Sequence, residues 1–293
     1  MRLATIRQNG KELGAVLVSN GVITLDALNK EKRFNLATDL LSLIREQQLP
    51  ELNKWYRAEG KCELEKMTSA VIPFEKVVYA PLYRHPKKIF GIGLNYADHA
   101  GDLAEKTPQG IPASFFKPET SIVGYGDNIK IPLQSQKTTG EAELGIIIGK
   151  ECENIEAKDW LRYIAGFTTI IDMTAEDILG LNPRYLTYVK SFETFFSFGP
   201  QLITTDEIKN LSGLKVQTVH NGEVYAENTV SSMTFPPDFL VAFHSKVFKW
   251  QPGDILSTGT PRAVQIVHGD TIECRITGFE PLVNPVIDKK IKK

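Results

Sequence analysis

The chain has 293 residues, which suits one large domain with a smaller one, because domains usually run to about 100 to 200 residues. Its 34 Lys and Arg balance 35 Asp and Glu, which gives no sign of a polyanion-binding surface, so we expect no nucleic acid partner. The first thirty residues contain no continuous apolar h-region of the kind a signal peptide has, and no later apolar run reaches the roughly 18 to 20 residues that cross a bilayer. We therefore expect neither a signal peptide nor a membrane partner.

The three cysteines, Cys62, Cys152 and Cys274, are odd in number, far apart and in no C-x-x-C pair. This pattern suits neither a disulfide framework nor a zinc site. We interpret them as reduced thiols, and the expected location is cytoplasmic.

The opening segment predicts a small β-meander over residues 1–25. Two Asn-Gly pairs, Asn9-Gly10 and Asn20-Gly21, stand between runs of alternating or β-branched residues, which is the short-range pattern of β-hairpins. From Asn35 to Lys66 the leucines recur at helical spacing and Pro50 interrupts the run, which predicts short helices.

Residues 71–87 contain three prolines in an extended stretch, which predicts a connection between two modules. We place the boundary near residue 80, so that a small α+β domain (1–80) precedes a larger domain (81–293). Only two convincing helices occur in the larger part, one after Asp172 and one in PDFLVAFHSKVFKW, so regular βαβ alternation is excluded. The predicted fold class is mixed β with few helices (α+β), mainly antiparallel. The strand-like runs are KIFGIGL, SFFKP, TSIVGYG, NIKIPL, EAELGIIIG, YIAGFTTIID, LKVQTVHNGEVYAENTV, DILSTGTP and DTIECRITGF.

The strongest chemical signal is the pair Glu141 and Glu143 at the head of an apolar run. On a strand, residues two apart share a face, so the two carboxylates would lie side by side and need a compensating positive charge. Taken alone, the pair fits better a strand that begins at the surface with both glutamates solvated. Asp172 supplies a third carboxylate, because it ends another apolar run just before a helix N-cap sequence. Three acids without a Cys or His at ligand spacing describe an all-oxygen site for Mg²⁺ or Mn²⁺.

A second signal is His99, which follows the strand-like run KIFGIGL with its paired glycines Gly91 and Gly93. These glycines are not a dinucleotide fingerprint, because the third glycine and a βαβ unit are missing. If residues 97–105 form a helical turn, Asp102 lies three residues after His99 and could orient it. A lone histidine is more often structural than catalytic, so this signal is weak by itself.

Together these segments resemble the fumarylacetoacetate hydrolase family, in particular its short members, the acylpyruvate hydrolases, oxaloacetate decarboxylases and hydroxyheptadienedioate isomerases. The resemblance covers roughly residues 88–287 and implies a β-roll catalytic domain behind a small N-terminal domain, and frequent homodimers. It is carried by GLNYADHA, FFKP, VGYGD, GEAELGIIIGK, IAGFTTIIDMTAED, KSFETF, PGDILSTGTP and VNPV, in the family's order.

The resemblance also assigns roles to individual residues. Glu141, Glu143 and Asp172 would bind Mg²⁺ or Mn²⁺, and His99 would form a dyad with Asp102, which stands where the family has a longer glutamate. Lys190 is a further catalytic candidate, which would stabilise developing negative charge. Gly259 and Thr260 would hold a substrate carboxylate, and Tyr96 and Lys117 are weaker substrate-binding candidates.

This chain departs from the family after the metal-binding aspartate. The family's Arg and Gln, which approach the substrate, are replaced by Glu176 and Leu179. The resemblance therefore implies a different or less acidic substrate, or lost activity, unless Arg184 or Arg262 substitutes.

The predicted function is metal-dependent hydrolysis of a C–C bond in an acylpyruvate-like 2-oxo acid, in which His99 and Asp102 deprotonate the attacking water. Decarboxylation or isomerisation of a 2-oxo diacid would use the same groups, and the sequence does not separate these reactions. A further alternative is a metal-binding family member that has lost catalysis and serves as a binding protein or scaffold.

Overall fold

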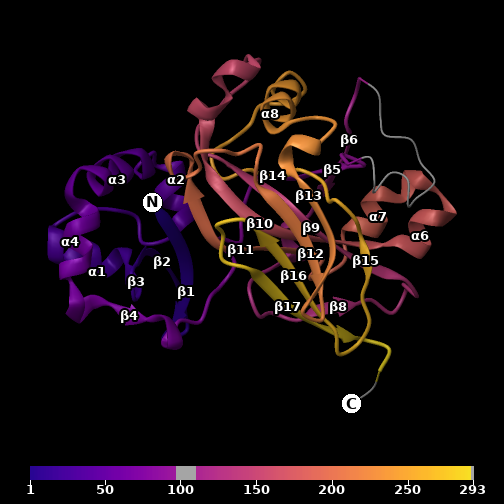
Figure 1. The fold of residues 1–293 in the computed structure, drawn as a ribbon, viewed down its shortest axis with the longest axis horizontal. Coiled ribbons are helices and arrows are strands. Elements are labelled where there is room, and N and C mark those ends of the chain that lie inside the picture. The colour runs from indigo at the N-terminus through magenta and orange to yellow at the C-terminus, as the bar shows by residue number, and fades with distance from the viewer. Residues whose placement is uncertain (97–109, 292–293) are drawn as a thin grey trace.

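The chain folds around two β-sheets in the computed structural model, which describes residues 1–96 and 110–291 (Figure 1). The predicted class of mixed β with few helices is confirmed. The larger sheet contains β1 (Arg2–Gln8), β2 (Lys11–Val18), β3 (Gly21–Thr24), β4 (Ile72–Pro73), β5 (Ile89–Gly93), β6 (Ala113–Lys117), β7 (Ile122–Val123), β9 (Thr138–Ile148), β10 (Ile164–Ala175), β11 (Phe196–Thr204), β14 (Ile255–Ser257) and β15 (Val264–Gln265). Its order is β4-β3-β2-β1-β11-β10-β9-β14-β5-β6, with β7 beside β11 and β15 beside β9.

The smaller sheet has the order β13-β12-β16-β17-β8. Its strands are β8 (Ile129–Ile131), β12 (Lys215–His220), β13 (Glu223–Thr229), β16 (Thr271–Ile276) and β17 (Leu282–Asp288). A hydrophobic core that includes Ile146 of β9, Cys274 of β16 and Trp250 joins this sheet to the larger one.

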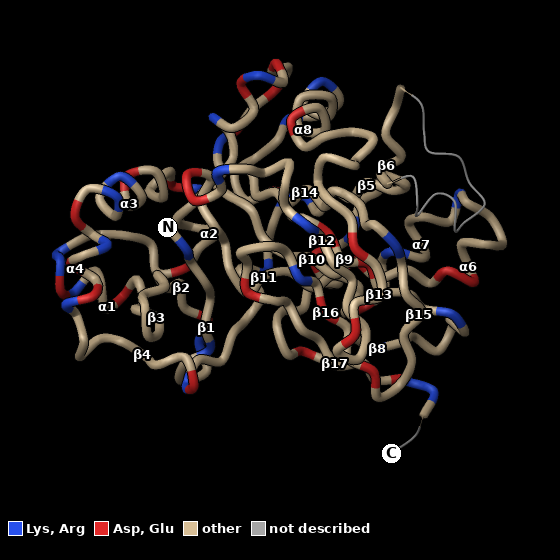
Figure 2. Tube along the Cα trace, in the orientation of Figure 1, with Lys and Arg blue, Asp and Glu red and all other residues tan. Residues whose placement is uncertain are grey.

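Short helices lie around the sheets, and basic and acidic residues are mixed along the N-terminal helical segment (Figures 1 and 2). Within the described residues, no helix combines the length and apolar character needed to span a bilayer. The α-helices are α1 (Leu25–Lys32), α2 (Leu40–Arg45), α3 (Leu49–Trp55), α4 (Lys61–Lys66), α6 (Glu176–Leu181), α7 (Leu186–Lys190) and α8 (Pro237–Ser245), and a π-helical turn (Tyr56–Gly60) joins α3 to α4.

The N-terminal meander and the following short helices are confirmed, with two differences in detail. Asn9 and Gly10 form the first turn with φ of 51° and 73°. The second hairpin turns one residue earlier than Asn20-Gly21, because Val18 pairs with Gly21. Gly21 is instead the first residue of β3, where a Cβ would lie 2.1 Å from the Ile72 carbonyl oxygen. Pro50 does not break a helix but lies in the first turn of α3, which proline tolerates.

The first strand pairs antiparallel with β11, so the larger sheet runs without a break from residues 1–24 into the strands that follow residue 88. A second hydrophobic core contains Leu3, Leu28 and Leu43 from the N-terminal segment together with Phe196 and Phe198 from β11. The N-terminal strands and helices therefore share this core with the strands that lie beside the candidate site.

Candidate metal centre and active site

Three carboxylates meet on one face of the neighbouring strands β9 and β10. The strands are antiparallel, and Glu141 lies directly opposite Asp172. Glu143 is two residues further along β9 and therefore points to the same face. One oxygen from each of the three side chains lies within 4.8 Å of the others, and the residues are 7%, 1% and 0% exposed in chain order. The register of one strand pair thus creates a compact, buried acidic triad.

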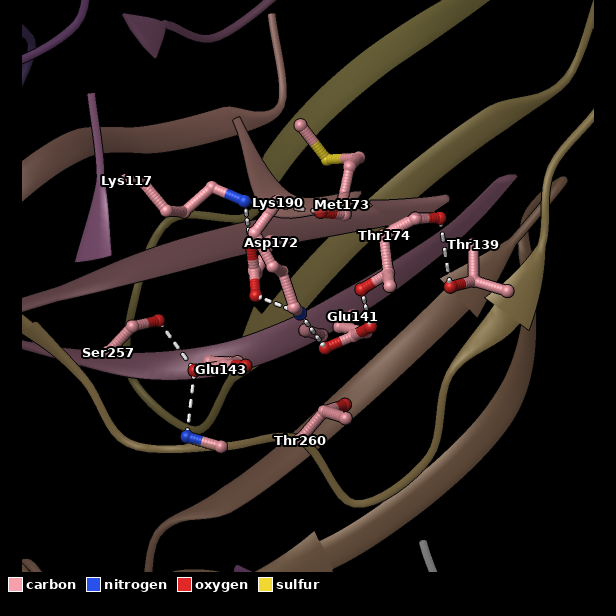
Figure 3. Close-up of polar contacts among 12 residues, drawn as sticks. Lys117, Thr139, Glu141, Glu143, Asp172, Met173, Thr174, Lys190, Ser257 and Thr260 are labelled. Carbon is pink, nitrogen blue, oxygen red and sulfur yellow. Dashed lines mark hydrogen bonds and ion pairs between the residues drawn. The ribbon is translucent and has the colours of Figure 1, made fainter. Parts of the chain in front are cut away.

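Two buried lysines neutralise part of this charge (Figure 3). Lys190, at the end of α7, donates from Nζ to Glu141 Oε2 at 3.0 Å and to Asp172 Oδ2 at 2.5 Å. Lys117, at the end of β6, donates to Asp172 Oδ1 and to the carbonyl oxygen of Met173. The Asp172 carboxylate therefore fixes both ammonium groups beside the triad.

Hydroxyl and amide groups hold the two glutamates. Ser257 Oγ and the Gly259 backbone N–H donate to Glu143 Oε2 at 2.5 and 2.7 Å, and Thr174 Oγ1 donates to Glu141 Oε1. Ser257 and Thr174 were not predicted as site residues. The sequence offered one signal for each: Thr174 lies two residues after the predicted Asp172, and Ser257 lies two residues before the predicted Gly259.

Burial changes the ionisation of the site. Burial first, and then repulsion from Asp172 and Glu141, raises the pKa of Glu143 to about 8. Burial also lowers the pKa of Lys117 to about 8, although Asp172 partly opposes this shift. Burial likewise acts to lower the pKa of Lys190, but the combined attraction of Asp172 and Glu141 outweighs it, so this pKa is raised. Lys190 therefore keeps its proton, whereas Glu143 lies in an environment that favours additional positive charge.

The residues present fit a divalent cation. With every group ionised, the three carboxylates and two ammonium groups carry a net charge of −1, which a divalent ion would convert to +1. The ligand atoms are all carboxylate oxygens, which suits the hard ions Mg²⁺ and Mn²⁺.

The structure places the other predicted site residues as follows. Tyr96 is 0% exposed, and its hydroxyl has no hydrogen-bond partner within the described part of the chain. The Gly259 amide is engaged by Glu143, and the buried Thr260 donates from Oγ1 to the Arg262 carbonyl oxygen at 3.2 Å. The predicted dyad of His99 and Asp102 lies outside the described residues.

Glu176 and Leu179, the two positions predicted to depart from the family pattern, lie where β10 runs into α6. Glu176 forms an ion pair with Lys137 at 2.5 Å, and Leu179 packs against the core. Arg184 and Arg262 are exposed, and the Arg262 guanidinium lies 5.5 Å from the Tyr225 ring centre.

The fold and the site together define a mixed β protein with a buried centre of carboxylates and lysines. Comparison with known proteins assigns the family, because the family model described as fumarylacetoacetate (FAA) hydrolase C-terminal matches residues 88–287. The chain belongs to the fumarylacetoacetate hydrolase family.

One relative is the mitochondrial oxaloacetate tautomerase Fahd2a of Rattus norvegicus, 34% identical over 74% of this chain and 72% of that protein. The solved 2-hydroxyhepta-2,4-diene-1,7-dioate isomerase of Mycobacterium marinum is 29% identical over 75% of this chain and 81% of its own, with a TM-score of 0.67. The maleylpyruvate hydrolase of Sphingobium sp. SYK-6, solved with manganese(II) and pyruvate, has a TM-score of 0.78 at 23% identity over 98% of this chain and 99% of its own, which shows the shared fold. Enzymes of this family act on 2-oxo acids, and family membership makes this the class of chemistry expected of the chain.

Proposed function

We propose that the protein is a Mg²⁺- or Mn²⁺-dependent enzyme that interconverts the enol and keto forms of a small 2-oxo diacid. The observation that carries the proposal is the buried triad of Glu141, Glu143 and Asp172 with Lys117 and Lys190 fixed beside it. A divalent cation held by the triad would supply Lewis acidity at the keto oxygen and so favour the enolate form of the substrate.

The chain's own residues prepare the site for an anion. The two ammonium groups are already oriented by Asp172, so they need no rearrangement when negative charge develops beside them. Their burial in a region of low dielectric strengthens this interaction relative to a lysine in water. Lys117 uses two of its three N–H groups on Asp172 and Met173, which leaves one donor for a substrate oxygen.

The relatives support enol chemistry. The names oxaloacetate tautomerase and dienedioate isomerase both describe rearrangements that move a proton without cleaving the carbon chain. The structure solved with manganese(II) and pyruvate makes that ion and that ligand class suitable probes. Hydrolysis of an acylpyruvate is the second candidate, and the sequence spacing of His99 and Asp102 favours it because hydrolysis requires a water-activating base.

The test uses metal-stripped protein with Mg²⁺ or Mn²⁺ added back. We expect metal-dependent loss of enol absorbance with enol-oxaloacetate or a hydroxydienedioate, abolished in Glu141→Gln and retained in Glu151→Gln, a matched change at an exposed carboxylate just beyond β9. Release of pyruvate from an acylpyruvate, lost in His99→Ala, would establish hydrolysis instead. Bound metal without turnover of any of these acids would refute the enzymatic proposal and favour a binding protein.

A further inference from the structure

A single oxygen of Glu143 receives two hydrogen bonds. Ser257 ends β14, which pairs antiparallel with β9 and sets Ser257 opposite Gly145, on the face that carries Glu143. The Ser257 hydroxyl and the Gly259 amide both donate to Oε2, and Ser257 and Glu143 are each 1% exposed (Figure 3). No described residue donates a hydrogen bond to Oε1.

This arrangement limits how Glu143 can hold a cation. Each carboxylate oxygen has two in-plane lone pairs, and the two donors occupy both lone pairs of Oε2. Oε1 is then the oxygen left for coordination, so Glu143 can contribute one ligand atom but not two. Mg²⁺ requires a compact octahedron at short distances, whereas Ca²⁺ takes six to eight oxygens and often uses both oxygens of one carboxylate.

We propose that Ser257 is a positioning residue that holds Glu143 for one-oxygen coordination and thereby selects Mg²⁺ and Mn²⁺ against Ca²⁺. The inference rests on the proposed metal-dependent function. It concerns the Ser257 hydroxyl specifically, because the other donor to Glu143 Oε2 is the Gly259 backbone amide, which a change of the Ser257 side chain does not remove. Removing the hydroxyl frees one lone pair of Oε2 for a larger cation, and it also weakens the hold on Glu143.

The test measures binding of Mn²⁺ and Ca²⁺ to the intact, metal-stripped chain by calorimetry, with electron paramagnetic resonance as a second readout for Mn²⁺. In Ser257→Ala we expect Mn²⁺ to bind about tenfold more weakly, at the lower end of the loss seen when outer hydrogen bonds to metal ligands are removed. Ca²⁺ should lose less or gain, so the ratio of the two affinities falls. Ser257→Thr retains a hydroxyl and should restore the wild-type ratio.

Two further variants separate this role from general packing. Ser257→Cys keeps the volume but supplies only a weak donor, so it should behave like Ser257→Ala. Ser197→Ala removes an equally buried hydroxyl of the same sheet, which donates to Asn284 Oδ1 at 2.7 Å, and should leave both metal affinities unchanged.

The outcomes are distinguishable. An unchanged ratio of Mn²⁺ to Ca²⁺ affinity in both Ser257→Ala and Ser257→Cys, whether neither affinity changes or both fall by the same factor, would overturn the selectivity role while leaving the proposed function intact. A wild-type chain that binds neither ion would overturn the proposed function and this inference together.

Discussion

Replacing Lys190 by methionine should destabilise the metal-free protein strongly. The Lys190 ammonium is 6% exposed and contacts Glu141 and Asp172 at 3.0 and 2.5 Å, so its removal leaves buried negative charge without its main partner. Breaking a buried ion pair in this way costs about 3–5 kcal/mol. With ~2.1 cal/mol/K of unfolding entropy per residue, this corresponds to a loss of roughly 5–8 °C in Tm for a chain of this length. Circular dichroism melting in the presence of a chelator measures the change.

The matched control is Lys130→Met. Lys130 contacts Glu193 at a similar 3.0 Å, but the two side chains are 34% and 57% exposed, and such pairs contribute about 0–1 kcal/mol. Added Mn²⁺ should raise the Tm of Lys190→Met more than that of the wild type, because one repelling positive charge has been removed beside the triad. Equal Tm losses in the two variants, or an equal response to Mn²⁺ in Lys190→Met and wild type, would refute the reasoning.

Three other changes test the site. Burial raises the Glu143 pKa to about 8, so below this pH a cation must displace a proton from Glu143 in the metal-free protein. The affinity for Mn²⁺ should therefore rise up to tenfold per pH unit from about pH 6 to 8 and then level off. A titration series with no slope would contradict this. Gly259→Ala places a Cβ 2.8 Å from the Asn95 Cβ at a φ of 94°, so chemical unfolding should show a loss of about 1–3 kcal/mol, together with weaker Mn²⁺ binding. Glu176→Gln leaves Lys137 without its carboxylate partner, so KM should fall for dianionic 2-oxo acids but not for monoanionic ones. Equal KM changes for both classes would count against a role in binding the second carboxylate.

Much of the triad could be predicted because its signal is local. The alternation of side chains along a strand puts Glu141 and Glu143 on one face, whatever the strand pairs with. The position of Asp172 at the end of an apolar run marked it as a third candidate. What the residues alone did not contain was the register that sets Glu141 opposite Asp172, since this depends on how β9 and β10 pair.

The supporting residues depend on contacts between distant parts of the chain. Ser257 lies 114 residues from Glu143, and Lys117 lies 55 residues from Asp172. A single hydroxyl or lysine in a strand carries no periodic pattern, so only the assembled sheet shows which carboxylate it contacts. Strand β11 was missed for a different reason, because Gly199-Pro200 in its middle resembles a strand break. Without β11, the pairing that joins the N-terminal strands to the larger sheet could not be predicted.

Glu176, which the resemblance places where the family has a positive residue, does not simply invert the charge of the site. Along β9 and β10 the same face carries Glu141 opposite Asp172 and then Thr139 opposite Thr174, and the Lys137 and Glu176 ion pair lies just beyond the strand ends. The outer pair is neutral, so the net charge near the substrate comes from the inner carboxylates, the two lysines and the proposed cation. With Glu143 ionised these sum to +1. Under the proposed function this charge would match one carboxylate of a 2-oxo acid, and a second carboxylate would compete with Glu176 for Lys137. Under the proposed function we therefore expect the buried centre to bind the first carboxylate, and selection between monoacids and diacids to depend on how tightly Glu176 retains Lys137.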